Sequence, residues 1–181
     1  KDTSRGLGDV YKRQLQNYEE RYDYYHKKEE KIEFDLEYFN KITKGGLPNK
    51  TLNIALAGTG VGKSLFMCHH ASSVLLQGRN VLYITMEMAE EKIAERIDAN
   101  LLDVSIQNLN DLPKNTFEKK VVNLAQKTQG QLIIKEYPTA SAHAGHFKTL
   151  LNELALKKSF KPDIIFVDYL NICASSRYRA G

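Results

Sequence analysis

The stretch Ala57-Gly58-Thr59-Gly60-Val61-Gly62-Lys63-Ser64 restricts the possible folds of this chain more than any other segment. A glycine-rich run that ends in Gly-Lys-Ser is typical of a phosphate-binding loop between a strand and a helix. The glycines allow backbone N–H groups to point inward at a phosphate, and the positive end of the following helix faces the same anion. We therefore predict that nucleotide phosphates bind at Gly58, Thr59, Gly60, Val61, Gly62, Lys63 and Ser64.

Two side chains of this loop have distinct predicted roles. Lys63 reaches the β- and γ-phosphates, and the Ser64 hydroxyl ligates Mg²⁺. Ala57 departs from the strict pattern, which has glycine there, but alanine is the smallest substitute. The alternative is a glycine-rich turn with an incidental lysine. The context favours the phosphate loop, because residues 51–56 are predicted to form a buried strand and residues 65–76 a helix.

Composition sets broad limits on what the chain can be. Its 181 residues are 42% hydrophobic and 27% charged, which is enough for one globular domain with a core. No apolar run reaches the length of a membrane span, and a net charge of +4 is too small to predict nucleic-acid binding by itself. Cys68 and Cys173 follow no disulfide pattern, which predicts reduced thiols and a cytoplasmic protein.

The chain divides into three predicted parts. Residues 1–14 show no periodicity and are expected to be a non-native or disordered leader. Residues 15–40 are polar and begin with several tyrosines, so we expect a linker helix and a lead-in there, with a solvated, frayed helix as an equal alternative. Residues 41–181 are expected to form a partial ATPase core that is truncated at its C-terminus, because the chain stops soon after a predicted strand.

Apolar periodicity after the loop predicts alternating strands and helices. The predicted strands are residues 80–86, 131–137 and 163–169, and the predicted helices are residues 89–102, 116–129 and 144–158. This order predicts an α/β fold with a mostly parallel sheet that is covered by helices on both faces.

An acidic residue ends the last predicted strand. Asp168 follows the apolar run Ile164-Ile165-Phe166-Val167. Ligands bind at the carboxyl ends of parallel strands, and in phosphate-loop enzymes an acid at this place holds Mg²⁺. We therefore predict that Asp168 and Ser64 hold Mg²⁺. The alternative is an aspartate that begins a loop or caps a helix.

A second carboxylate, Glu87, follows the predicted strand at residues 80–86. At the same sheet edge it could accept a proton from an attacking water. It could equally be a cap or first-turn acid of the helix near Ala89, where Glu90 and Glu91 also favour the helix dipole. Spacing alone leaves both interpretations open.

Several further motifs occur in order along the chain and carry a family resemblance. They are Thr43-Lys44-Gly45-Gly46, the phosphate loop, residues 80–91, Arg96-Ile97-Asp98-Ala99-Asn100, Leu150-Leu151-Asn152-Glu153-Leu154 and Val167-Asp168-Tyr169-Leu170. With these motifs, residues 15–178 resemble the DnaB-like hexameric replicative helicases, in particular those of T-even bacteriophages. The resemblance implies a RecA-like phosphate-loop NTPase fold.

The resemblance also implies a function. It implies an ATP- and Mg²⁺-dependent motor that translocates on single-stranded DNA and unwinds duplex, with Lys63 and Glu87 as catalytic residues and Glu87 as the base. It implies a homo-hexamer with a primase and a helicase loader as partners, and the cytoplasm of an infected bacterium if the protein is phage-encoded. Residues 15–31 match the linker that docks on the adjacent subunit of such rings.

The resemblance further implies segments outside this sequence. The γ-phosphate sensor, the arginine finger and the DNA-binding loops follow the Asp168 strand in that family, and a collar domain precedes the linker. We therefore expect this chain alone to bind nucleotide with little turnover.

Two other functions fit the residues when the resemblance is set aside. A recombinase or a regulatory RecA-like ATPase would share the features up to Asp168. A small-molecule kinase with a phosphate loop would carry an arginine-bearing lid, which the sequence lacks. His143 and His146 are spaced like metal ligands on a helix, but without further ligands nearby we interpret them as exposed residues at a helix start.

Overall fold

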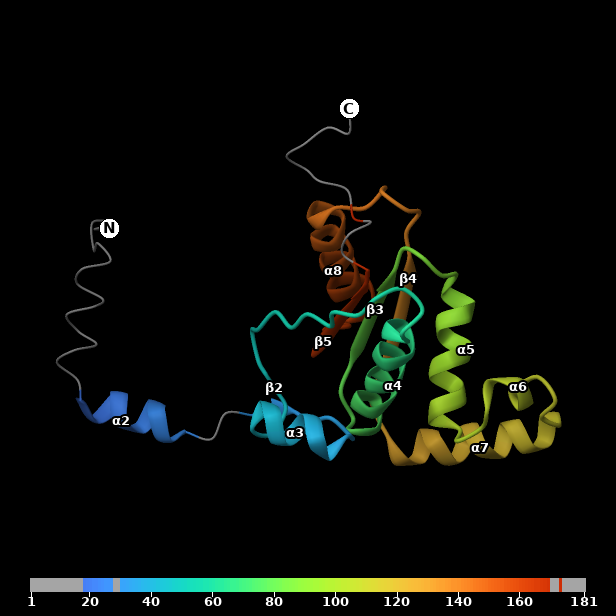
Figure 1. Cartoon of the computed structure of the whole chain (residues 1–181), viewed down its shortest axis with the longest axis horizontal. Coiled ribbons are helices and arrows are strands. Elements are labelled where there is room, and N and C mark those ends of the chain that lie inside the picture. Colours follow the sequence, from blue (N-terminus) through green and yellow to red (C-terminus); the bar gives the residue numbers. More distant parts are fainter. Residues whose placement is uncertain (1–17, 28–29, 170–172, 174–181) are drawn as a thin grey trace.

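Three parallel strands form the sheet at the centre of the chain. The computed structural model describes residues 18–27, 30–169 and 173, and Figure 1 shows their arrangement. In this part of the chain, β3 (Val81–Thr85) lies between β4 (Leu132–Glu136) and β5 (Ile164–Asp168), and both pairings are parallel. All three strands therefore end at one edge of the sheet.

Three long helices flank this sheet. They are α4 (Lys63–Leu76), α5 (Glu90–Leu101) and α8 (Ala144–Lys158). Each follows the pattern read from the sequence, because apolar residues recur at helical spacing on the face that meets the sheet.

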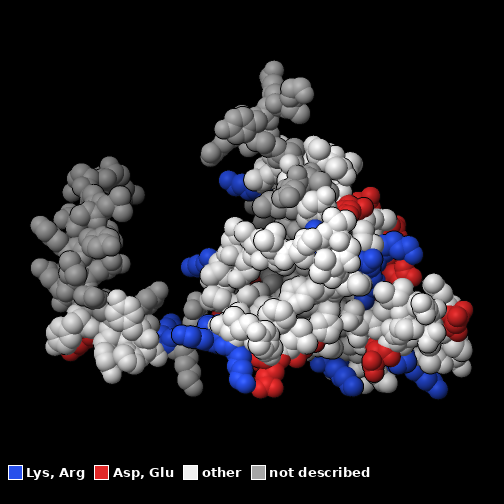
Figure 2. Space-filling view, viewed as in Figure 1, with Lys and Arg blue, Asp and Glu red and all other residues white. Residues whose placement is uncertain are grey.

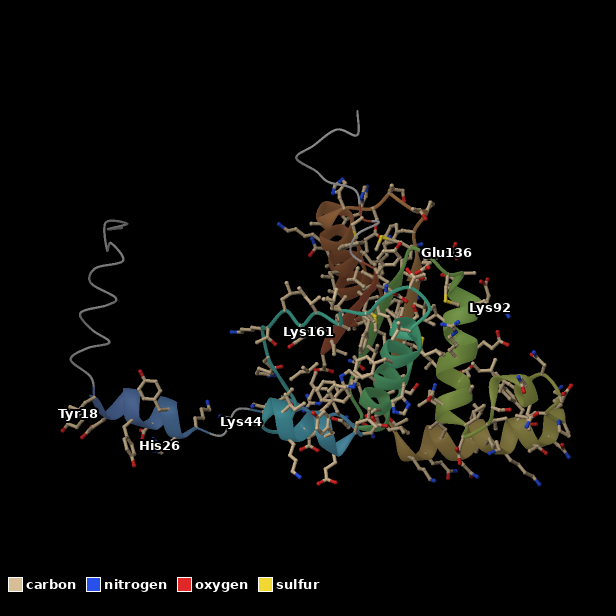
Figure 3. All side chains as sticks on the ribbon, in the orientation of Figure 1. Tyr18, His26, Lys44, Lys92, Glu136 and Lys161 are labelled. Carbon is tan, nitrogen blue, oxygen red and sulfur yellow. The ribbon has the colours of Figure 1, made fainter. Side chains whose placement is uncertain are left out.

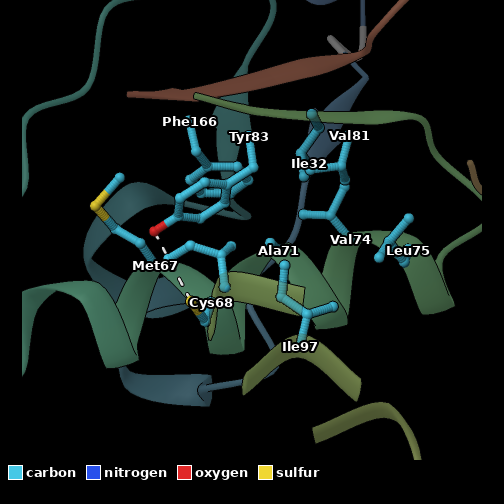
Figure 4. Close-up of a cluster of buried hydrophobic side chains, with 11 residues drawn as sticks. Ile32, Met67, Cys68, Ala71, Val74, Leu75, Val81, Tyr83, Ile97 and Phe166 are labelled. Carbon is cyan, nitrogen blue, oxygen red and sulfur yellow. Dashed lines mark hydrogen bonds between the residues drawn. The ribbon is translucent and has the colours of Figure 1, made fainter. Parts of the chain in front are cut away.

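The side chains of β3 point alternately into two hydrophobic cores. Val81 and Tyr83 pack with α4 and α5 on one face of the sheet, and Figure 4 shows this cluster. Leu82 and Ile84 pack with α8 on the other face. Because both faces are covered, all residues of β3 are buried. The predicted α/β fold, with a parallel sheet and helices on both faces, is confirmed.

Two further helices connect α5 to β4. The sequence pattern predicted α7 (Lys114–Lys127), but it did not predict α6 (Ile106–Leu109). A single turn is too short for a periodic signal, and α6 depends on a local cap, since Ser105 Oγ accepts a hydrogen bond from the Asn108 N–H at 3.2 Å. Figure 1 shows both helices at the lower end of α5, with α7 running back toward the start of β4.

The segment before the loop has short elements of its own. They are α2 (Tyr18–His26), β1 (Lys31–Ile32), α3 (Glu37–Thr43) and β2 (Leu47–Pro48), and β1 pairs antiparallel with β2. Figure 3 shows α2, labelled at Tyr18 and His26, apart from the rest of the chain. The predicted leader, residues 1–14, lies outside the described residues.

This segment docks on α4. The Phe34 ring stacks on the His70 ring of α4, with 4.3 Å between the ring centroids. About two turns further along, at the end of α4, Gln77 Nε2 donates a hydrogen bond to the Glu33 carbonyl oxygen at 2.9 Å. The lead-in is therefore held on the helix that begins at the phosphate loop.

The prediction of a buried strand over residues 51–56 is wrong. The segment has no regular secondary structure, and Leu52, Ile54 and Leu56 are 84%, 73% and 95% exposed. A strand needs a neighbour for its backbone N–H and C=O groups, and the sheet of described residues, ordered β4-β3-β5, does not include this segment. The apolar run suggested burial, but pairing depends on distant residues that a local pattern does not reveal.

Candidate nucleotide-binding site

The amino end of α4 is open to an anion. Gly62 precedes this helix with a φ of 102°, and Gly60 has a φ of 75°, angles that favour glycine. Within the described part of the chain, no side chain caps the helix, and its first turn holds no acidic residue. The N–H groups of Lys63 and Ser64 belong to the first turn of the helix, where they have no partner within it. The helix dipole stabilises a phosphate at that place.

The predicted phosphate-binding residues all lie in one accessible turn. Residues 58–61 are exposed, and Gly62, Lys63 and Ser64 are partly buried. The loop is therefore accessible from solvent and leads directly into the positive end of α4.

Asp168 brings a carboxylate to the same place. It is the last residue of β5 and is fully buried. Its Oδ1 lies 3.8 Å from Lys63 Nζ, and the Tyr83 hydroxyl donates a hydrogen bond to its Oδ2 at 3.1 Å. Oδ1 accepts no hydrogen bond from any described residue. A buried carboxylate oxygen without a donor is a natural acceptor for a cation or for a cation-bound water.

Lys63 lies between this carboxylate and an aromatic ring. Its Nζ is 3.8 Å from the centroid of the Tyr169 ring, and its side chain is 23% exposed. A cation–π contact and an ion pair therefore hold the ammonium group beside the end of β5. The partial exposure leaves the group accessible to an anion that enters from the loop.

Glu87 lies at the same sheet edge, with its side chain in solvent. The Met86 N–H donates to the backbone oxygen of Asp168 at 2.9 Å, so the backbone just before Glu87 lies beside the end of β5. The capping interpretation of Glu87 is wrong, because α5 begins at Glu90 with Ala89 in the cap position. The structure thus brings Lys63 and Asp168 into contact and places exposed Glu87 directly after Met86, whose backbone is bonded to that of Asp168.

Comparison with known proteins identifies the family. A sequence profile of the DnaB-like helicase C terminal domain matches residues 32–180. The chain belongs to the DnaB-like helicase family. It is 51% identical over 168 residues to the DnaB-like replicative helicase of Enterobacteria phage T4, an alignment that covers 91% of this chain and 35% of that protein. This match confirms the resemblance that the motifs indicated.

A bacterial relative matches less closely. The probable plasmid replicative DNA helicase of Chlamydia psittaci is 26% identical over 126 residues, which cover 68% of this chain and 27% of that protein. The chain therefore spans about a third of the length of the phage T4 relative and about a quarter of the length of the Chlamydia psittaci relative.

The side chains at this site of the DnaB-like chain suit Mg²⁺. This ion takes oxygen ligands and keeps several of its waters. Asp168 Oδ1 is a buried oxygen with no donor among the described residues, and it lies 3.8 Å from Nζ of Lys63, the residue that precedes Ser64 at the start of α4. The donor set therefore fits a hydrated Mg²⁺ that also contacts a phosphate, with Asp168 and Ser64 as the residues that would hold it.

Sequence reasoning missed two tyrosines at this site, Tyr83 and Tyr169. Burial raises the pKa of the Tyr83 phenol far above its usual value, and the nearby Cys68 and Asp168 act in the same direction. The phenol therefore stays protonated, and its hydroxyl donates a hydrogen bond to the Asp168 carboxylate. The signal available in the sequence was a tyrosine hydroxyl within an apolar strand. In the structure the Tyr83 side chain lies on the face of the sheet that meets α4.

The two histidines with metal-ligand spacing have a structural role. His143 Nδ1 accepts a hydrogen bond from the Gly145 N–H at 3.0 Å, and His146 Nδ1 accepts one from the His143 N–H at 3.2 Å. They form a capping box at the start of α8. Across the described ranges, no three potential metal-ligating side chains cluster, and no helix is long and apolar enough to span a bilayer.

Proposed function

We propose that this chain is part of the ATP-driven motor of a replicative DNA helicase. The observation that carries the proposal is the contact of Lys63 with Asp168, 3.8 Å apart, at the uncapped start of α4. In a phosphate-loop ATPase, a lysine at this place contacts the phosphate oxygens and a carboxylate holds Mg²⁺. The family supports the same function, because both relatives are named as replicative helicases.

Binding of ATP uses the loop and the start of α4. The N–H groups of residues 58–64 surround the β- and γ-phosphates, and the Lys63 ammonium moves from Asp168 and Tyr169 to the phosphate oxygens. Ser64 and Asp168 would hold Mg²⁺, and the ion would supply positive charge that offsets the charge of the phosphates. The positive charge of Lys63 thereby balances the negative charge of the phosphates, which the Asp168 carboxylate would otherwise repel.

Hydrolysis uses Glu87 as the general base. Its carboxylate accepts a proton from a water whose oxygen attacks the γ-phosphorus, while the bond between that phosphorus and the bridging oxygen of ADP breaks. The exposed position of Glu87 at the carboxyl edge of the sheet supports this role, because an attacking water must reach the γ-phosphate from the solvent side.

The motor acts within a larger assembly. By family, the chain works in a homo-hexamer on single-stranded DNA, with an arginine from the neighbouring subunit at each ATP and with a primase and a helicase loader as partners. We propose that this assembly works in the cytoplasm, which is that of an infected bacterium if the protein is phage-encoded. Residues 15–40 serve as its linker and lead-in, and residues 41–181 as part of its ATPase core.

The net charge of this chain does not by itself support the proposal that it contacts DNA. Its net charge is only +4, and on the face drawn in Figure 2 basic and acidic side chains are interspersed over the described surface. The proposal that it moves on DNA therefore rests on the family and on the ATP site.

Binding of a fluorescent ATP analogue to the 181-residue chain tests the site. We expect Mg²⁺ to tighten binding to the wild-type chain and Asp168→Asn to abolish that effect. Asp103→Asn is the matched control, since this exposed aspartate has a positive φ of 52°, which asparagine also adopts readily. Nucleotide binding that is equal in wild type and Asp168→Asn at every Mg²⁺ concentration would refute the assignment of Asp168.

DNA unwinding by the complete protein tests the function. We expect Lys63→Ala and Glu87→Gln each to abolish duplex separation. Duplex separation that neither substitution affects would contradict the site assignment. ATP-dependent binding to DNA without unwinding by the wild type would favour a recombinase or regulatory ATPase, and transfer of phosphate to a small molecule would favour a kinase.

A further inference from the structure

We propose that Tyr83 is a positioning residue that orients the Asp168 carboxylate for Mg²⁺. The inference rests on the proposed function of the site. Tyr83 lies in the middle of β3. It belongs to none of the groups assigned above, which are the phosphate loop, the acid at the end of β5 and the predicted base. Its basis is one hydrogen bond between two fully buried side chains, Tyr83 Oη to Asp168 Oδ2 at 3.1 Å.

The strand register sets up this bond. Thr85 on β3 lies opposite Asp168 on β5, and Tyr83 lies opposite Phe166. Side chains two residues apart on a strand share a face, so Tyr83 and Asp168 are diagonal neighbours across the two strands. A diagonal neighbour is within reach of a long aromatic side chain, and the tyrosine hydroxyl therefore meets the carboxylate at the end of β5.

The direction of the hydrogen bond is fixed by its neighbours. The Cys68 thiol lies 3.8 Å from Tyr83 Oη and donates to it, as the dashed line in Figure 4 marks. The Tyr83 hydroxyl in turn has one proton, and an ionised carboxylate can only accept. The phenol proton is therefore committed to Asp168 Oδ2.

The ring of Tyr83 is itself held in place. It stacks on the Phe166 ring with 5.6 Å between centroids, and its side chain lies in the core with α4 and α5. A rigid donor fixes the rotation of the carboxylate about its own axis. Oδ2 is bound to the core, and Oδ1 is left without a donor on the side of Lys63. Tyr83 thus decides which carboxylate oxygen serves the cation.

A purely structural tyrosine would behave differently. Buried tyrosine hydroxyls generally find a partner, and loss of that partner lowers stability whatever the ligand. A positioning role predicts in addition that the response of nucleotide binding to Mg²⁺ changes. Substitution of a residue that orients a metal ligand typically lowers metal affinity about 10- to 100-fold.

The test measures the Mg²⁺ concentration that gives half of the Mg²⁺-dependent increase in binding of a fluorescent ATP analogue to the 181-residue chain. We expect Tyr83→Phe to raise this concentration about tenfold and to change affinity in EDTA less than twofold. Tyr137→Phe is the control, because Tyr137 packs with Phe147 of α8 in the core on the other face of the sheet. An unchanged Mg²⁺ requirement in folded Tyr83→Phe would overturn the proposal.

Asp168→Asn separates this inference from the proposed function. If Asp168→Asn loses the Mg²⁺ response and Tyr83→Phe keeps it, only the role of Tyr83 is refuted. If the wild-type chain shows no Mg²⁺ response, the proposed function and this inference fail together.

A second measurement covers the case in which Tyr83→Phe does not fold. Incorporation of 3-fluorotyrosine at position 83 keeps the ring and the hydroxyl. We expect its ¹⁹F signal to shift when Mg²⁺ is added to the ADP-saturated chain, because the phenol is bonded to the carboxylate that receives the cation. A signal that Mg²⁺ leaves unchanged would overturn the proposal.

Discussion

The Lys63 ammonium lies 3.8 Å from the Asp168 carboxylate, although one residue begins a helix and the other ends a strand. The contact exists because the loop before α4 and the carboxyl end of β5 meet at one edge of the sheet. Both charges are therefore in place before any ligand enters, and binding requires only that Lys63 turn toward the phosphates.

Lys63→Ala is expected to weaken nucleotide binding about 100-fold, since one charge-assisted contact to phosphate contributes about 1.5–3 kcal/mol. Titration of a fluorescent ATP analogue measures the change. Lys92→Ala is the control, because Lys92 is 65% exposed and pairs only with Glu95 within the described residues. Equal affinities of the Lys63 and Lys92 variants would contradict the assigned role.

His70 is expected to make the chain less stable in acid. Burial lowers the pKa of this imidazole to about 4, against an opposing effect of Asp35 and a reinforcing one of His69. Neither ring nitrogen has a hydrogen-bond partner among the described residues. The unfolded chain then binds a proton below its normal pKa of about 6.5 and the folded chain does not, so stability falls as pH drops from about 6.5 toward 4.

The size of this effect follows from the two pKa values. Between pH 7.5 and pH 5 we expect the free energy of unfolding to fall by about 2 kcal/mol because of His70. Urea unfolding of the wild type and of His70→Phe at both values measures it, since phenylalanine fits the aromatic surroundings and does not titrate. His26→Asn is the control, as His26 is exposed on α2. The prediction fails if His70→Phe shows the same pH dependence as the wild type.

Gly46→Ala is expected to destabilise the lead-in more than Gly78→Ala. Both glycines have a positive φ, 110° and 78°, so alanine is strained at either position by about 1 kcal/mol. A Cβ at Gly46 would also lie 2.2 Å from the Ile32 carbonyl oxygen, whereas one at Gly78 would meet nothing within 4 Å. Thermal unfolding of the two variants compares them, and an equal loss of stability would show that the Ile32 contact is unimportant.

Asn80→Ala is expected to lower stability without weakening nucleotide binding. The Asn80 side chain accepts from the Gln131 N–H at 3.1 Å and donates to the Lys161 carbonyl at 3.1 Å, so it joins the starts of β3, β4 and β5. Loss of these bonds costs about 1–3 kcal/mol. The proposed nucleotide site lies at the opposite edge of the sheet, where the strands end. Chemical unfolding and nucleotide titration measure both quantities, and an affinity loss above threefold in the folded variant would contradict this separation.

The fold could largely be predicted because its elements carry local patterns. The apolar run that becomes β5 and the helical spacing of Phe147 and Leu154 were sufficient, and α8 begins and ends at the predicted residues 144 and 158. Residues 51–56 show the limit of such patterns. Like β5 they contain several large apolar residues, but in the described structure they pair with no strand of the sheet and stay exposed.

The site could be predicted where chemistry follows chain order. The loop residues 58–64 and Asp168 stand at fixed places relative to a helix start and a strand end, so their positions could be predicted, while their roles toward nucleotide and Mg²⁺ remain proposals. The bond from Tyr83 to Asp168 could not, because it depends on the register between β3 and β5. The role of Glu87 as base remains a prediction.

The unpaired segment at residues 51–56 has a practical consequence. Thr51-Leu52-Asn53-Ile54-Ala55-Leu56 contains no charge, proline or glycine, and three large apolar side chains on it face water. Six-residue segments of this composition are the ones that stack into cross-β fibrils when they are accessible. We therefore expect the 181-residue chain to self-associate as its concentration rises, and a charged residue at Ile54 to keep it monomeric at concentrations where the wild type scatters light.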